Sequence, residues 1–141
     1  MKFQNNVINK NVAAAIIDAE RLLHPDSKMM QELKLKNDFK YNSGTGVEVY
    51  NRVINCDVVA PVFTYRPFWF RSKVLGYADG KAIYLNLYKL DKLNHAELVG
   101  LLLHEWLHLG PKFGHGNNYK TKDKVNFSVN YFVSENVGKW L

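Results

Sequence analysis

Apolar positions in the first third of the chain recur at helical spacing. In residues 11–23 they form one stripe, made of Val12, Ile16, Ala19 and Leu23. The dipeptide His24-Pro25 is typical of a helix end, because the residue before proline avoids helical backbone angles. A shorter helix is predicted from Ser27 to about Lys36, and the stretch NSGTG at 42–46 predicts a loop.

The middle of the chain changes to the two-residue period of strands. Residues 47–53, VEVYNRV, alternate, and residues 58–65 are β-branched and aromatic, so strands are expected across 47–65. Pro61 indicates an edge or a bulge within them. Asp79-Gly80 lies between two apolar runs and predicts a hairpin, whose second strand covers Ala82 to Leu87.

The segment after this hairpin predicts a central helix. Asn94 and Glu97 have the spacing of a capping box, and the run LVGLLLHEWLHL that follows is apolar on nearly all sides. Gly110-Pro111 predicts its end, with the glycine suited to a left-handed position. Gly100 lacks a side chain one turn before His104, which leaves room for another group to approach.

Length and composition set the class of protein. The 141 residues fit a single domain, residues 1–141, with 47% hydrophobic and 23% charged residues as in ordinary globular proteins. No run reaches the ~20 apolar residues that span a bilayer. We expect an α+β fold: a small, twisted, mostly antiparallel sheet packed with the helix that carries the candidate site and with flanking helices.

The central helix carries the strongest chemical signal of the chain, HEWLH at 104–108. His104 and His108 are four residues apart, so both imidazoles lie on one helix face and can bind one tetrahedral zinc ion. Glu105 is rotated by roughly 100° and can reach a water at the metal as a general base. Without a cation, two buried histidines and a glutamate would be costly, so the pattern favours one zinc ion per chain.

A catalytic zinc ion usually has a third protein ligand. His115 follows within a short loop between Gly114 and Gly116, so it can return to the metal without a second element. Glu135 is the alternative, because a helix over 126–140 would place a carboxylate on another face from its apolar stripe. We favour His115.

Two tyrosines are candidates for stabilising an oxyanion. Tyr119 and Tyr131 could each donate a hydrogen bond to a substrate oxygen during hydrolysis, although packing alone would also explain either residue.

The hairpin strand, the capped helix, HEWLH and a downstream histidine together resemble the zincin metallopeptidases over residues 74–119. The spacing to His115 departs from the metzincin pattern, and no methionine follows Met30, so the chain does not resemble a typical metzincin. Residues 114–119, GHGNNY, are similar to the glycine-histidine and aromatic motif of the SprT-like and Wss-type families. The resemblance implies a zincin-like fold and a small zinc endopeptidase, with a peptide or protein substrate lying along the last sheet strand.

Charge and termini bear on partners and compartment. The net charge of +6 makes nucleic acid an alternative partner, as in SprT-like members that act on nucleic-acid-bound proteins. A non-catalytic, zinc-stabilised binding module is the other alternative, but such a module has no use for Glu105. We expect a monomer. The lack of a visible signal peptide favours the cytoplasm, whereas a leader removed beforehand would indicate secretion.

Overall fold

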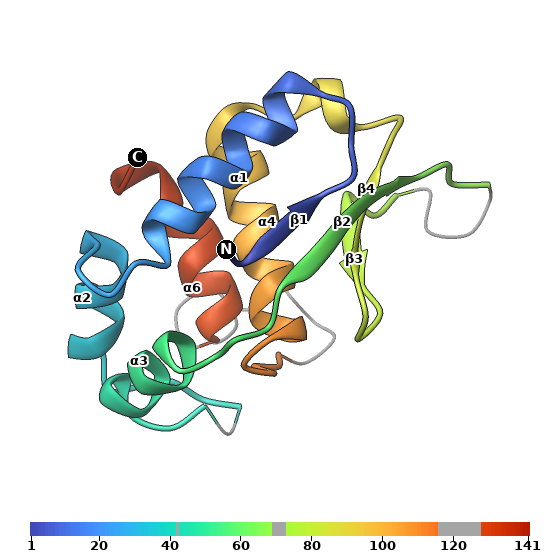
Figure 1. The fold of residues 1–141 in the computed structure, drawn as a ribbon. Helices are drawn as coiled ribbons and strands as arrows, with labels where there is room; N and C mark the ends of the chain where they lie inside the picture. Colours follow the sequence, from blue (N-terminus) through green and yellow to red (C-terminus); the bar gives the residue numbers. More distant parts are fainter. Residues whose placement is uncertain (42, 69–72, 116–127) are drawn as a thin grey trace.

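The computed structural model describes residues 1–41, 43–68, 73–115 and 128–141. In that part, the elements run β1 (Phe3–Asn5), α1 (Lys10–Leu22), α2 (Lys28–Leu35), α3 (Gly46–Ile54), β2 (Ala60–Tyr65), β3 (Gly76–Ala78), β4 (Ile83–Asn86), η1 (Leu90–Lys92), α4 (His95–Leu109), α6 (Val129–Asn136) and η2 (Val137–Lys139). The strands form one side of the molecule and the helices the other (Figure 1). The prediction of the α+β fold class is therefore confirmed.

The sheet differs from the predicted one in its pairing. Its strand order is β1-β2-β4-β3, and both β1–β2 and β2–β4 are parallel. Among the described strands, only the β3–β4 hairpin is antiparallel, with Tyr77 opposite Tyr84. The expectation of a mostly antiparallel sheet was therefore wrong, because the helices between β1 and β2 make a long connection that returns the chain in the same direction.

Strand β4 is an interior strand and β3 is the edge. The expectation that a substrate lies along the last strand was wrong, because β4 is paired with β2 on one side and with β3 on the other. Pro61 also lies in an interior strand, β2, contrary to the expected edge or bulge. The proline is tolerated there because Ala60 donates to Lys2 and Val62 accepts from Asn6, both toward β1, while pairing with β4 begins only at Val62.

Residues 46–54 form helix α3 and not the predicted strand. Thr45 and Glu48 make a complete capping box at its start, and the buried side chains Val49 and Val53 are four residues apart. The run VEVYNRV fits both periods, but the T-x-x-E signal that precedes it favours a helix. This helix packs against α2.

Helix α4 is the centre of the fold, as its apolar sequence predicts. It contacts α1 on one side, α6 on another, and strands β3 and β4. The predicted apolar stripe of residues 12–23 is buried, and Met30 and Leu33 of α2 are buried as well. Among the described residues, the largest fully buried side chain is Trp106, whose indole N–H donates to the carbonyl of Val58 at 3.2 Å. The site residues on α4 are thus surrounded by packed structure.

Candidate metal centre

Helix α4 begins with the capping box that its sequence predicts. Asn94 accepts from the backbone N–H of Glu97 at 2.8 Å, and Glu97 accepts from the backbone N–H of Asn94 at 3.1 Å. From this cap the helix continues for 15 residues to Leu109. The imidazoles of His104 and His108, one turn apart, have ring centroids 5.0 Å apart.

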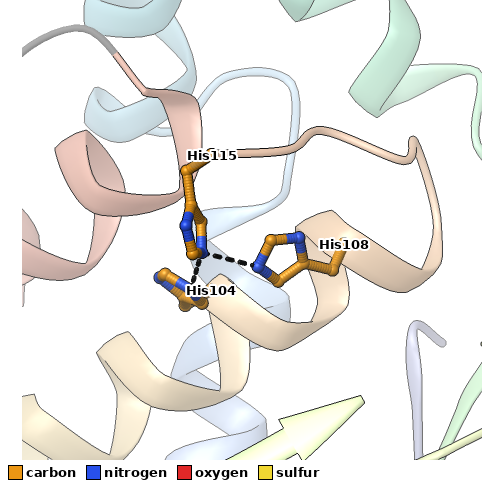
Figure 2. A group of neighbouring side chains, drawn as sticks. All are labelled: His104, His108 and His115. Carbon is orange, nitrogen blue, oxygen red and sulfur yellow. Dashed lines mark hydrogen bonds between the residues drawn. The ribbon is translucent and has the colours of Figure 1, made fainter. Parts of the chain in front are cut away.

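The chain returns after α4 and brings a third imidazole to the same point. The Nε2 atom of His115 lies 3.1 Å from Nε2 of His104 and 2.9 Å from Nε2 of His108 (Figure 2). Tetrahedral ligands at a zinc–nitrogen distance of 2.0–2.1 Å would be about 3.4 Å apart, so the three atoms are close to ligand spacing. This group of histidines could hold a metal ion.

The protons on the three rings show why a cation suits this arrangement. Nδ1 of His108 lies 2.8 Å from the carbonyl of Phe113, which can only accept, so this nitrogen carries the proton. The ring of His104 likewise hydrogen-bonds the backbone of Asn130. In the neutral rings both Nε2 atoms therefore present lone pairs toward His115. One N–H of His115 cannot point at both, and a metal ion would satisfy all three nitrogens.

The surroundings keep two of these rings neutral. Burial lowers the pKa of His104 to about 3, with further lowering by the charges of His108 and His115, and the hydrogen bond to Asn130 partly opposes this. Burial, followed by the proximity of His115, also lowers the pKa of His108. Neutral imidazole is the form that binds a metal, so at pH 7 these two side chains are in the required state.

Glu105 follows His104 on α4 and does not belong to the group of converging donors. Its side chain is buried between α4 and the hairpin, and burial raises its pKa to about 8. The backbone of Ala78, on the edge strand β3, hydrogen-bonds the carboxyl group and opposes part of this rise. A buried glutamate with a pKa near neutrality has the properties of a general acid or base.

The other candidate residues have different outcomes. The ring of Tyr131 lies 4.7 Å from that of His104 and 4.5 Å from that of His115, measured between centroids, so this tyrosine borders the three histidines. Tyr119 lies outside the described residues. Glu135 is exposed and is not among the donors that converge in the described part of the chain.

Sequence reasoning missed Asn130 on α6. Its side chain is completely buried, and its amide donates to the carbonyl of His104 at 3.1 Å while its backbone hydrogen-bonds the ring of the same histidine. A polar residue between Val129 and Val133 in an apolar helix was the available signal. Asn130 orients a candidate ligand in the way that outer hydrogen-bond partners of metal sites do.

The expectation of close approach at Gly100 is confirmed, whereas the expectation of a left-handed Gly110 was wrong. The group that approaches Gly100 is helix α6, because a Cβ there would lie 3.0 Å from the Ser134 carbonyl. Gly110 is not in the left-handed region, and a Cβ there would meet Sγ of Cys56 at 2.9 Å. The left-handed residue is Lys112, with φ 63°. A Cβ on Gly114 would meet nothing within 4 Å, and Gly114 is not among the glycines with a positive φ.

Comparisons with known proteins found no matching family model, curated protein or solved structure. Among the helices of the described ranges, none has the length and apolarity needed to cross a membrane. The geometry and electrostatics of the histidine group are therefore the basis for a functional proposal.

Proposed function

We propose that this protein is a zinc-dependent metallopeptidase, an endopeptidase of the zincin type that resembles the SprT-like and Wss-type enzymes. The observation that carries the proposal is the convergence of three imidazole Nε2 atoms, together with a buried glutamate that follows the first histidine on the same helix. Three imidazole nitrogen ligands suit zinc and leave its fourth position for water or substrate.

His104, His108 and His115 would hold the ion. When bound, zinc supplies Lewis-acid polarisation of a substrate carbonyl and makes a neighbouring water acidic, with a pKa near ~7. Glu105 would accept a proton from that water and pass it to the leaving amine. Next to a dication, the ionised carboxylate is favoured, which offsets the raised pKa that burial gives Glu105.

Two further features support hydrolysis of a peptide. Strand β3 is an edge of the sheet that the described residues form, and its residue Ala78 hydrogen-bonds Glu105, so a peptide that pairs with β3 would pass next to the general base. The ring of Tyr131 packs against two of the zinc-binding imidazoles, and its hydroxyl would donate to the oxyanion. Tyr131 would then have a role in the reaction as well as in packing.

The test combines elemental analysis with the variant Glu105→Gln. We expect one zinc per chain in both proteins and a loss of hydrolysis of an unstructured protein by about 10²–10⁴-fold in the variant. Glu135→Gln, which changes an exposed glutamate, serves as the matched control and is expected to keep full activity. Stoichiometric zinc with equal activity in wild type and Glu105→Gln would overturn the mechanism.

A non-catalytic zinc-stabilised module is the alternative, and one observation favours it. The three histidines tie the segment after α4 back onto α4, which is what a structural zinc ion does. This alternative predicts that zinc removal unfolds the segment and that no unstructured protein is cleaved. The SprT-like alternative of action on nucleic-acid-bound proteins rests on the motif at residues 114–119 and on the net charge of +6, and it predicts steeply salt-dependent binding to DNA.

A further inference from the structure

The third histidine lies on a segment without secondary structure of its own. Residues 110–115, here called the return loop, leave the end of α4 and turn back over it to His115 (Figure 2). His104 and His108 are fixed by the hydrogen bonds of a helix, whereas the return loop needs contacts from elsewhere to hold His115 in position. One of these contacts, to Pro111, comes from a residue that lies 59 positions before that proline in the chain.

That residue is Arg52, in the last turn of α3. Its guanidinium donates a hydrogen bond to the carbonyl of Pro111, and its central carbon lies 4.1 Å from the centre of the Phe113 ring. A planar guanidinium can donate in its plane and stack on an aromatic face at the same time. Arg52 therefore contacts the return loop at two points, both within four residues of His115.

Phe113 connects this contact to the candidate metal site. Its ring is buried beneath Arg52, and its backbone N–H donates to the carbonyl of Leu107 at 2.9 Å. Its own carbonyl lies 2.8 Å from Nδ1 of His108 and so sets the tautomer and orientation of that ring. The residue that Arg52 covers thus holds one ligand directly and precedes another by two positions.

We propose that Arg52 is a positioning residue for the metal site, which holds the return loop so that His115 meets His104 and His108. This inference rests on the proposed metal-binding function and adds to it a residue of α3. The competing explanation is that Arg52 only supports α3, because a cation in the last turn of a helix is favourable in itself.

The experiment measures zinc affinity by competition with chelators of graded strength. For Arg52→Gln in the full chain we expect a loss of about 10–100-fold, the range for removal of an outer partner of a metal ligand. Arg52→Lys keeps the charge but lacks the planar fork, so an intermediate loss is expected. Arg21→Gln is the matched control, because Arg21 is also the basic residue of a last helical turn, on α1, and should leave the affinity unchanged.

A double-substitution cycle separates positioning from general support of the fold. In a His115→Ala background, Arg52→Gln is expected to have a smaller effect on zinc affinity, since His115 is absent and only the contact of Phe113 with His108 remains to be positioned. In metal-free protein, Arg52→Gln should speed amide exchange at Phe113, whose N–H is bonded to Leu107, more than at the end of α3.

The outcomes distinguish this inference from the function on which it rests. Equal losses in the two backgrounds, or wild-type affinity in Arg52→Gln, would overturn the positioning role while leaving the zinc site in place. A wild-type protein that binds no zinc would overturn the proposed function, and the positioning role with it.

Discussion

Two regions supply the converging histidines, and they are held by different kinds of interaction. Helix α4 presents His104 and His108 on a backbone whose hydrogen bonds are local and whose surface is packed on several sides. The return loop presents His115 from residues 110–115, held by Arg52, by the bond from Phe113 to Leu107 and by the contact of Phe113 with His108. Spacing in the sequence fixes the first region, while contacts between distant parts of the chain fix the second.

The largest expected effect comes from removing one ligand from each region. His108→Ala and His115→Ala should each weaken zinc binding by about a thousandfold or more, which exceeds the 10–100-fold typical of losing an outer partner. His108→Ala should be the more severe, because its ring also bonds the carbonyl of Phe113 and so helps to hold the return loop. Chelator competition measures both losses.

Glu135→Ala is the control for this pair of substitutions. Glu135 is exposed and lies outside the group of converging donors, so wild-type affinity is expected. Loss of zinc in Glu135→Ala, with retention in His115→Ala, would show that the third ligand comes from α6 and that the comparison between helix and loop is wrong.

The next effect concerns the stability of the metal-free protein, and it tests how far burial on α4 raises the pKa of Glu105. The pKa of Glu105 rises from 4.5 to about 8 on folding, so the folded state binds the proton more tightly. The protonated carboxyl group of Glu105 contributes fully to the free energy of unfolding below pH ~4.5, and this contribution is lost as pH rises toward about 8. Glu105→Gln lacks this titration and should be more stable than wild type by about 3 kcal/mol at pH 7, but nearly equal to it at pH 4.

Urea unfolding with a chelator present, at pH 4, 7 and 9, measures this difference. The same substitution is expected to abolish hydrolysis, so stability and activity should change in opposite directions, as is common for residues at active sites. Curves for wild type and variant that remain parallel across this pH range would mean that Glu105 is not a buried, protonated group in the metal-free protein.

A third prediction concerns how α6 approaches α4. In Gly100→Val, a Cβ would lie 3.0 Å from the carbonyl of Ser134 and 3.2 Å from Cγ1 of Val137. We expect a loss of stability of about 2 kcal/mol from overpacking. Zinc affinity should also fall, because α6 carries Asn130, which orients His104.

Gly114→Ala is the matched control in the return loop, since its Cβ would meet nothing within 4 Å. Thermal unfolding and chelator competition on both variants give the comparison. If Gly114→Ala lost zinc while Gly100→Val kept it, the glycine next to His115 would matter more than the packing of the helices, contrary to the structure.

The same difference between regions explains what could be predicted from the sequence. The capping box at Asn94, the buried character of α4 and the shared face of His104 and His108 follow from local rules and were predicted correctly. The hairpin at Asp79-Gly80 was also predicted, because two residues specify that turn.

What failed depended on contacts between distant segments. The parallel pairing of β1 with β2 is decided by a connection of three helices, and no residue of either strand specifies it. Helix α3 has an ambiguous apolar pattern, and only its capping box distinguishes it from a strand. The roles of Arg52 and Asn130 depend on which segments meet at the site, so single residues at those positions carried little signal.

The smallest predicted effect concerns the backbone of the return loop itself. Lys112 has a φ of 63°, a left-handed conformation that costs an L-residue roughly 1–2 kcal/mol and that glycine adopts freely. Lys112→Gly relieves this strain but adds freedom to the unfolded chain, so we expect a net stabilisation of about 0.5 kcal/mol with unchanged zinc affinity. Lys112→Val should instead destabilise the protein by about 1 kcal/mol and weaken zinc binding, because a β-branched residue resists the left-handed region. Urea unfolding and chelator competition measure both variants. A weaker zinc site in Lys112→Gly would mean that the stiffness of this residue, in addition to the contacts from Arg52, holds His115 against α4.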